Sequence, residues 1–213
     1  MAPYLPPVET PPSLFLRLIY FVMRRQLGKV QFEKLMTPIA VHSARMPASF
    51  LSFYGKVSRL DKKLRLPSET AMLIRERVAS INSCEFCMDT NRWYATRDSV
   101  ENAARYDALA EYKTSPLFTD AERAALDYAT ELTGNRRVEP KTFARLARCY
   151  SEREICDIVW LVASEHLYNM TNIGLNIGSA GLCELNVASR PAGEVGAASS
   201  SRAGDKRVSA SSG

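Results

Sequence analysis

Residues 66–95, LPSETAMLIRERVASINSCEFCMDTNRWYA, hold the pattern that decides the fold. After Ser68, apolar residues recur every three or four positions, which is the spacing of one buried face of an α-helix. The members of this stripe are Ala71, Ile74, Val78 and Ile81. Asn82 and Ser83 are residue types that cap helix starts, so a second helix is expected to begin at about Cys84. The segment therefore predicts two consecutive helices joined by a short turn.

The rest of the chain has the same helical periodicity. Three pairs have the spacing of a capping box, in which a Ser, Thr or Asp precedes a Glu by three residues. They are Asp98 with Glu101, Thr119 with Glu122, and Ser151 with Glu154. Other expected boundaries are a helix from Ser13 to Leu27 before Gly28, a start at Pro47, a stop at Gly134, a start at Pro140, and a last helix from Glu152 to about Ile173. No stretch alternates as a strand does, so we predict an all-α domain of about six to eight helices over residues 13–186.

One face of the expected last helix is apolar apart from a single histidine. Its members are Ile155, Ile158, Val159, Val162, His166, Met170 and Ile173. Because these positions follow helical spacing, we expect this face to be the buried one.

The two ends of the chain differ from this domain in composition. Residues 1–12 contain five of the eleven prolines, which predicts an extended arm without fixed structure. From Ala188 onward, Ser, Ala and Gly make up 17 of 26 residues. Such a segment buries too little apolar surface to offset its ordering entropy, so we predict a disordered tail over residues 187–213.

The composition excludes several classes of protein. The 213 residues are 46% hydrophobic and 24% charged, which is typical of soluble globular proteins. The net charge of +5 is too small to indicate a nucleic-acid partner. The most apolar run, Leu14 to Met23, contains Arg17 and is shorter than the roughly 20 residues that cross a bilayer. The N-terminus has no basic segment ahead of an apolar run, so we expect a cytoplasmic protein without a membrane partner.

Cys84 and Cys87 form a C-x-x-C pair among five cysteines, an odd number that does not suggest a secreted disulfide framework. At a helix start, unpaired N–H groups and the helix dipole stabilise a thiolate and lower its pKa. A neighbouring thiol can then close a disulfide, as reversible thiol redox chemistry requires. Two other interpretations stay open: cysteines that only pack, and half of a zinc site, for which no second C-x-x-C or H-x-x-x-H exists.

Two parts of the chain together resemble the carboxymuconolactone decarboxylase superfamily, in its alkylhydroperoxidase D-like branch. Residues 66–95 are similar to the core motif of that branch, C-x-x-C followed by x-x-x-His. Residues 117–133 and 151–183 are similar to the second half of its longer members, where an Asn-x-x-Asn helix leads into Gly-Ser-x-Gly-x-Cys. The matching residues here are Asn169, Asn172, Gly178, Ser179, Gly181 and Cys183. The resemblance covers about residues 12–186.

The resemblance implies an alkylhydroperoxidase D-like helical bundle that assembles into homo-oligomers. It also implies that Cys87 reacts with a peroxide to give a sulfenic acid, while Cys84 supplies a proton and closes the disulfide. The expected function is that of a thiol-dependent peroxidase or disulfide reductase. Its substrate is a small-molecule peroxide or disulfide, and its reductant is an external dithiol. No metal, flavin, haem or other cofactor is implied.

Two positions of the family's proton relay differ in this chain. The relay His is replaced by Asn91 and the relay Glu by Met72. An amide orients a water but accepts no proton near pH 7, so a general base worth about 10² to 10⁴ in rate is missing there. Asn91 itself is a possible relay residue through such a water, with a purely structural role in holding the turn as the alternative. Three residues are candidate replacements, each with a structural alternative. Glu76 is the first candidate, and its alternative is a solvated ion pair with Arg75 or Arg77. Asp89 is the second, with an exposed polar residue as the alternative, and His166 is the third, with a buried structural histidine as the alternative.

Two further functions stay open. The altered relay favours a non-enzymatic redox-sensing or structural oligomer of the same fold, and a lactone decarboxylase-like enzyme is the other alternative, which the intact C-x-x-C opposes. Cys149 and Cys156 are expected to pack, with a disulfide between them as the alternative, and Cys183 has no assigned role. Trp93 and Tyr94 either shield the thiols, line a substrate cleft or pack in the core.

Overall fold

The computed structural model describes residues 2–11, 13–27, 29–97 and 101–183, and every regular element in these ranges is helical. The helices are α1 (Leu14–Leu27), α2 (Lys29–Leu35), α3 (Thr37–Val41), α4 (Ala48–Asp61), α5 (Ser68–Ile81), α6 (Glu85–Arg97), α7 (Glu101–Asp107), α8 (Asp120–Asn135), α9 (Pro140–Cys149) and α10 (Glu152–Gly174). Single 3-10 turns lie at Ser43–Arg45 and Leu109–Glu111. The predicted all-α fold is confirmed, but the described residues form ten α-helices instead of the expected six to eight, because the chain before α5 is divided into four helices. The predicted tail over residues 187–213 lies outside the described residues.

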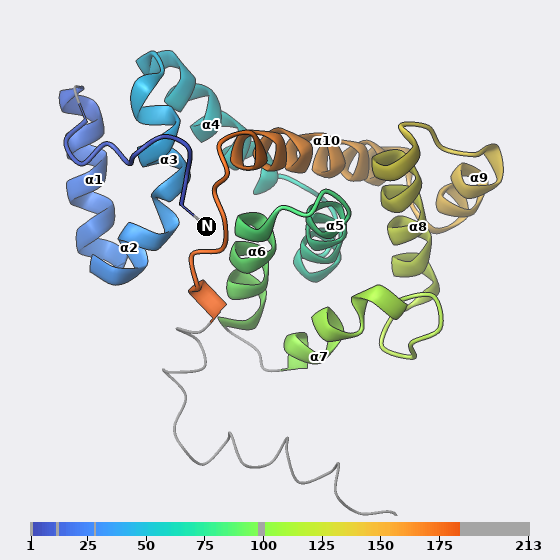
Figure 1. Ribbon diagram of the computed structural model, residues 1–213. Coiled ribbons are helices and arrows are strands. Elements are labelled where there is room, and N and C mark those ends of the chain that lie inside the picture. The colour runs from blue at the N-terminus through green and yellow to red at the C-terminus, as the bar shows by residue number, and fades with distance from the viewer. Residues whose placement is uncertain (1, 12, 28, 98–100, 184–213) are drawn as a thin grey trace, which may run out of the picture.

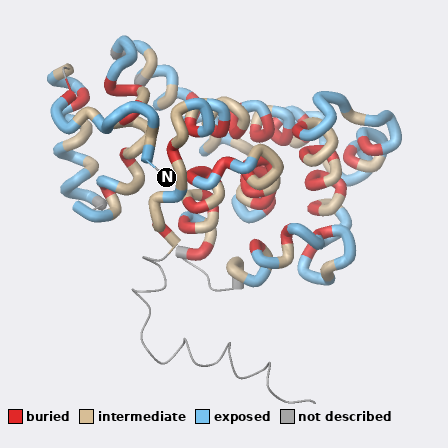
Figure 2. The backbone as a smooth tube through the Cα atoms, in the orientation of Figure 1, coloured by how far each residue is buried: buried red, intermediate tan, exposed pale blue. Residues whose placement is uncertain are grey.

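The helices are arranged around α10, which runs along one side of the molecule (Figure 1). α5 packs against α10, α8 and α6, while α8 and α9 lie at the N-terminal end of α10 and α1 to α4 at the other end. Buried residues gather where α5, α8 and α10 meet (Figure 2). Their largest side chains include Ile74, Val78, Leu146, Ile158 and Leu161. Each contributes about 1.5–3 kcal/mol relative to an exposed position, so this core fixes α5 against α10.

Capping residues explain where two of the long helices begin. Thr119 and Glu122 form a complete capping box at the start of α8, and Ser151 and Glu154 form another at the start of α10. In each box the hydroxyl accepts from the Glu N–H and the carboxylate accepts from the cap N–H, so two free helix donors are satisfied. Both predictions are confirmed. The third pair includes Asp98, which lies outside the described residues.

Two predicted details of α8 and α10 are wrong. α8 passes through Gly134 and ends at Asn135, because Arg136 takes the left-handed conformation (φ 57°) that terminates the helix. On α10, three residues expected inside are exposed: Val159, Met170 and Ile173. The buried face instead carries polar residues, which a search for apolar spacing does not detect. These are Glu165, Asn169 and Asn172.

The proline-rich arm is extended but held in place, which corrects the expectation of an arm without fixed structure. The N–H of Tyr4 donates to the carbonyl of Leu175 (3.0 Å), and the N–H of Val8 donates to that of Ala40 (2.9 Å). Arg45 Nη2 also donates to the Pro6 carbonyl at 2.7 Å. The arm thus ties α3 to the segment that follows α10.

The most apolar run of the sequence forms α1, which leaves much of its apolar surface exposed. Its exposed side chains include Leu14, Phe15, Leu18 and Phe21. In the part of the chain that the structure describes, no helix combines the length and the apolar content that a membrane crossing requires.

Candidate active site

A tight turn between α5 and α6 places the C-x-x-C pair. Ser83 takes the left-handed conformation (φ 57°), and the N–H of Cys84 bonds to the Ala79 carbonyl (2.9 Å), which closes α5 as a Schellman motif. The carbonyl of Cys84 accepts the first bond of α6, from the Met88 N–H (2.9 Å). Cys84 therefore stands at the N-cap of α6 and Cys87 lies in its first turn. The helix start near Cys84 is as predicted, but the expectation that Asn82 and Ser83 cap it is wrong, because both residues end α5.

The two sulfur atoms lie 2.6 Å apart and both cysteines are free thiols. Both residues are buried, with Cys84 1% and Cys87 5% exposed. Their surroundings are not purely apolar, because Asn172 Nδ2 on α10 donates to Cys87 Sγ at 3.3 Å. Tyr168 and Met88 pack against the pair. A substrate can therefore reach the sulfurs only when some of these side chains move.

The contact between the two sulfurs shifts the pKa values of the two thiols in opposite directions. The side-chain hydrogen bond between the two thiols, together with the Cys87 backbone N–H, lowers the pKa of Cys84 against the opposing effect of burial. The hydrogen bond with Cys84, and then burial, raises the pKa of Cys87. The N-cap position explains this order, because a group there faces the free N–H donors of the first turn. The pair thus loses its first proton from Cys84 and holds the second on Cys87.

A buried carboxyl on α10, which the sequence pattern did not single out, acts on both thiols. Glu165 is 2% exposed, and its carboxylate accepts from Arg75 Nη1 (2.9 Å) and from Asn169 Nδ2 (2.8 Å). Burial raises the pKa of Glu165, and Arg75 opposes that shift. The negative charge of Glu165 raises the pKa of Cys84 and of Cys87. One signal was available: Glu165, Asn169 and Asn172 have the spacing of a single helix face.

Glu76 is the second buried carboxyl, and it lies on α5. Glu76 is 7% exposed, and its Oε2 atom has no hydrogen-bond partner among the described residues. Burial, followed by the charge of Glu165, raises the pKa of Glu76 to about 8. The alternative of a solvated partner of Arg75 or Arg77 is wrong. Arg75 pairs with Asp61 and Glu165, and Arg77 Nε donates to Thr130 Oγ1 (2.9 Å).

Asn91 and His166, the two other predicted relay residues, occupy different parts of the hydrogen-bond network around the thiols. Asn91 on α6 is buried, and its amide lowers the pKa of both Glu76 and Glu165. His166 meets the site through Asn82, whose Nδ2 contacts His166 Nδ1 (3.2 Å) and donates to an oxygen of Asn169 (2.8 Å). Burial lowers the pKa of His166. Asn91 thus lies beside the carboxyls, whereas His166 belongs to the outer edge of the network.

Asp89 has a structural role that explains the Gly-Ser-x-Gly-x-Cys segment. Its carboxylate accepts from Ser179 Oγ (3.0 Å) and from three backbone N–H groups, those of Ala180 (3.0 Å), Leu182 (2.9 Å) and Cys183 (2.9 Å). Burial acts to raise the pKa of Asp89, but these hydrogen bonds outweigh it and lower the pKa. Asp89 therefore fastens the end of the described chain to α6, and the interpretation of an exposed polar residue is wrong.

The remaining cysteines and aromatic residues also have defined places. Cys149 and Cys156 are exposed free thiols, so the expectation that they pack is wrong. Trp93 is buried, whereas Tyr94 is 45% exposed and lines a cavity. Among the described residues, no group of three or more His, Cys, Asp or Glu side chains is arranged to hold a metal ion.

Comparison with known sequences places the chain beside uncharacterised bacterial proteins. No family model matches it. It is 31% identical over 189 residues to the uncharacterised protein YnjA of Escherichia coli (strain K12), covering 85% of this chain and 96% of YnjA. It is 25% identical over 121 residues to the uncharacterised protein YdfG of Bacillus subtilis (strain 168), covering 56% of this chain and 82% of YdfG.

Comparison with solved structures shows the fold. A cysteine-to-alanine variant of the debrominase Bmp8, in complex with 2,3,4-tribromopyrrole, superposes with a TM-score of 0.71 at 21% identity and covers 88% of this chain and 97% of Bmp8. An Agrobacterium tumefaciens protein of unknown function, described as the antioxidant defence protein AhpD, superposes with a TM-score of 0.60 at 20% identity. That match covers 65% of this chain and 96% of the other.

Proposed function

The chain belongs to the same family as YnjA, and we propose that it is a thiol-dependent oxidoreductase that reduces a peroxide or a disulfide with Cys84 and Cys87. Its alkylhydroperoxidase D-like fold, that of the carboxymuconolactone decarboxylase superfamily, supports this proposal. The observation that carries this proposal is the 2.6 Å contact between two free sulfurs at the start of α6. Such a contact gives one sulfur thiolate character and leaves the other ready to close a disulfide.

The reaction with a peroxide balances with the two thiols alone. The Cys84 thiolate attacks one oxygen of the peroxide, an S–O bond forms, the O–O bond breaks, and the departing oxygen takes a proton to leave as an alcohol or water. Cys87 then attacks the Cys84 sulfenic acid, which releases water and leaves the disulfide. An external dithiol returns two electrons and two protons. The roles of the two cysteines are thus the reverse of those that the family resemblance implies, because the lowered pKa belongs to Cys84.

Glu76 is the proton donor that fits this scheme. With its pKa raised to about 8, its carboxyl is protonated at neutral pH and can supply a proton to the departing oxygen. Asn91 stands beside it where the family has a relay histidine, and an amide of this kind orients a donor or a water without exchanging its own proton.

Peroxide consumption with a dithiol reductant tests the proposal in wild type, Cys84→Ser, Cys87→Ser and Cys149→Ser. We expect both variants of the pair to lose turnover, and Cys149→Ser, which removes an exposed thiol, to keep it. Cys87→Ser is expected to stop at a Cys84 sulfenic acid, which a dimedone adduct reports. Full turnover in either variant of the pair would overturn the proposal.

A second candidate function is redox sensing without turnover, which the burial of both sulfurs favours. A sensor forms one disulfide per chain when peroxide is added but does not consume peroxide continuously in the presence of dithiol. The same samples separate the two functions. Bmp8 is named a debrominase, so replacing peroxide with a brominated pyrrole in this assay tests whether the pair here also reduces a carbon–bromine bond.

A further inference from the structure

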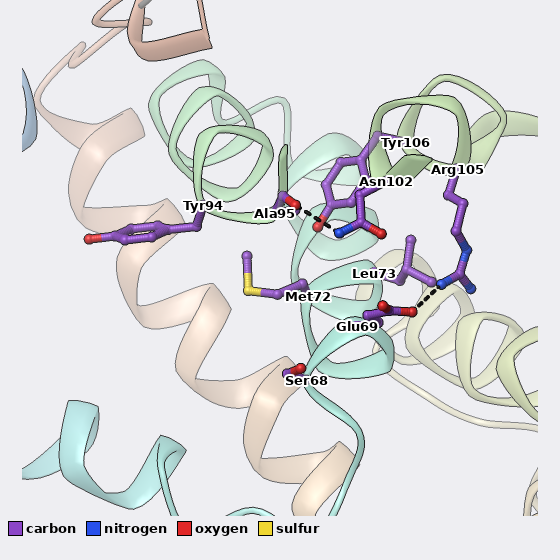
Figure 3. A pocket seen from close by; sticks show the side chains of 9 residues that line it. All are labelled: Ser68, Glu69, Met72, Leu73, Tyr94, Ala95, Asn102, Arg105 and Tyr106. Carbon is purple, nitrogen blue, oxygen red and sulfur yellow. Dashed lines mark hydrogen bonds and ion pairs between the residues drawn. The ribbon is translucent and has the colours of Figure 1, made fainter. Parts of the chain in front are cut away.

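A cavity of about 350 Å³ lies between the N-terminal half of α5, the end of α6 and α7 (Figure 3). Its walls are largely apolar: Met72, Leu73 and Ala95 contribute to them, and Tyr94 and Tyr106 add two aromatic rings. Neither Cys84 nor Cys87 lines it. A space of this size is at the lower end of the range for sites that bind small organic molecules.

Two buried polar atoms of the residues that line the cavity have no hydrogen-bond partner among the described residues, Arg105 Nε and the Tyr106 hydroxyl, and only the hydroxyl is uncharged. Tyr106 is 8% exposed, its hydroxyl lies among the lining side chains (Figure 3), and it makes no hydrogen bond with the described residues. A buried hydroxyl without a partner costs about 1–3 kcal/mol, so such a group in a native protein requires an explanation. Burial, followed by the charge of Glu76, raises the pKa of Tyr106, so this hydroxyl keeps its proton and remains a donor.

The charge of Arg105 is compensated by two carboxylates, although its Nε has no hydrogen-bond partner among the described residues, and the Asn102 amide donates to the backbone. Arg105 Nη1 pairs with Glu69 (2.9 Å), and its Nη2 pairs with Glu122. Asn102 Nδ2 donates to the Ala95 carbonyl (2.8 Å). The single cation of the wall therefore faces two carboxylates, and the site offers no uncompensated positive charge to an anion.

We propose that this cavity is a binding site for a small uncharged aromatic molecule whose hydrogen-bond acceptor meets the Tyr106 hydroxyl. The two tyrosine rings and the Met72 thioether give favourable contacts to an aromatic ring. The site stands apart from the thiol pair, so the proposal holds whether or not Cys84 and Cys87 turn over a substrate.

Calorimetric titration with acetophenone, toluene and benzoate tests the site on wild type, Tyr106→Phe and the matched control Tyr150→Phe. Acetophenone, which is neutral and carries an acceptor, is expected to bind wild type and the control equally. Its affinity for Tyr106→Phe is expected to fall about threefold to tenfold, the value of one neutral hydrogen bond. Toluene, which has no acceptor, is expected to bind wild type and Tyr106→Phe alike, and the anion benzoate to bind at least about tenfold more weakly than acetophenone.

A cavity-filling variant gives an independent arm. Met72→Trp, or Ala95→Leu if the first variant does not fold, is expected to abolish acetophenone binding. The proposal is overturned if no uncharged probe binds wild type at millimolar concentration. It is equally overturned if Tyr106→Phe binds acetophenone as wild type does, or if the folded filling variant keeps the affinity.

Discussion

At the scale of single residues, the site contains two buried carboxyls that interact electrostatically with the thiol pair, Glu165 with both cysteines and Glu76 with Cys84. Glu165 forms an ion pair with Arg75, whereas one oxygen of Glu76 has no hydrogen-bond partner among the described residues. The two carboxyls therefore have different roles in the site. A carboxyl that stays protonated at neutral pH is a proton donor, whereas the Glu165 carboxyl already accepts from Arg75 and Asn169. Glu76 is therefore the group that a peroxidase mechanism can use.

The first prediction concerns the pH dependence of stability in Glu76→Gln. The pKa of Glu76 is about 8 in the folded protein and near 4.5 in the unfolded chain, so unfolding releases a proton between these values. Wild type therefore loses stability as pH rises through this window, and the neutral glutamine does not. We expect Glu76→Gln to gain stability relative to wild type from about pH 5 to pH 8, as measured by urea unfolding.

The same variant is expected to lose activity while it gains stability. Peroxide turnover should fall by about 100-fold, because an amide supplies no proton. Glu85→Gln is the matched control, since Glu85 is exposed in the first turn of α6 and adjacent to Cys84. Equal stability of Glu76→Gln and wild type across the whole pH window would show that Glu76 is ionised in the folded protein.

Part of this residue-level picture could be predicted from the sequence. The helical spacing up to Ile81 is a local signal and predicted a new helix at about Cys84, but Asn82 and Ser83, expected to cap that helix, end α5 instead. Glu165 could not be found in the same way, because its importance comes from α10 packing on α5 and from a partner 90 positions earlier in the chain. The structural role of Asp89 was missed for a similar reason, because the four groups that donate to its carboxylate come from residues 179–183.

At the scale of elements, the turn at Ser83 fixes where α6 begins. A non-glycine residue at φ 57° costs free energy that glycine does not pay. We expect Ser83→Gly to raise the free energy of unfolding by up to about 1 kcal/mol and Ser83→Val to lower it by about 1–3 kcal/mol. Ser58→Val, at an exposed position of α4, is the control and should change the free energy of unfolding by less than about 0.5 kcal/mol. Equal effects of Val at both positions would contradict the strained turn.

The anchoring of residues 179–183 to α6 gives a second prediction at this scale. Asp89→Ala leaves three backbone N–H groups without their acceptor, so we expect a loss of about 2–4 kcal/mol in unfolding free energy. Because the pKa of Asp89 is lowered in the folded state, this contribution is present at neutral pH and disappears as pH falls through that pKa. Hydrogen exchange should increase within residues 179–183 and not in α8. An unchanged hydrogen-exchange pattern in Asp89→Ala would contradict the claim that Asp89 anchors residues 179–183 to α6.

Element boundaries were predictable where a side chain itself makes the cap. Thr119 and Ser151 mark the starts of α8 and α10 because their own hydroxyls satisfy the helix donors. The end of α8 was missed because the left-handed residue is Arg136, and the glycine two positions earlier is an ordinary helical residue. The buried face of α10 was predicted correctly at Ile155, Ile158 and Val162, but its C-terminal half was missed because it carries a carboxylate and two amides instead of apolar groups.

At the scale of the whole molecule, the N-terminal arm connects distant parts of the chain. The arm donates to Leu175 and Ala40 and accepts from Arg45 and, through Ala2, from Asn176 (2.8 Å). We expect deletion of residues 2–9 to lower the free energy of unfolding by about 1–3 kcal/mol, at roughly 0.5 kcal/mol for each hydrogen bond, since those of Arg45 and Asn176 are exposed. Chemical denaturation measures this directly. A deletion variant as stable as the full chain would show that the arm adds nothing to the fold.

The assembly of the chain into homo-oligomers stays a prediction of the family resemblance. Sedimentation velocity over a range of protein concentrations checks it, and a single monomeric species throughout would contradict it.

The central claim is that contact between the two sulfurs makes Cys84 acidic and Cys87 resistant to ionisation. The most direct measurement is the pH dependence of iodoacetamide alkylation, followed for each cysteine by peptide mass spectrometry, with exposed Cys149 and Cys156 as internal controls. We predict that Cys84 titrates below the roughly 8.5 of a free thiol and Cys87 well above it. Titration of both cysteines together with the internal controls, or of Cys87 before Cys84, would contradict the account.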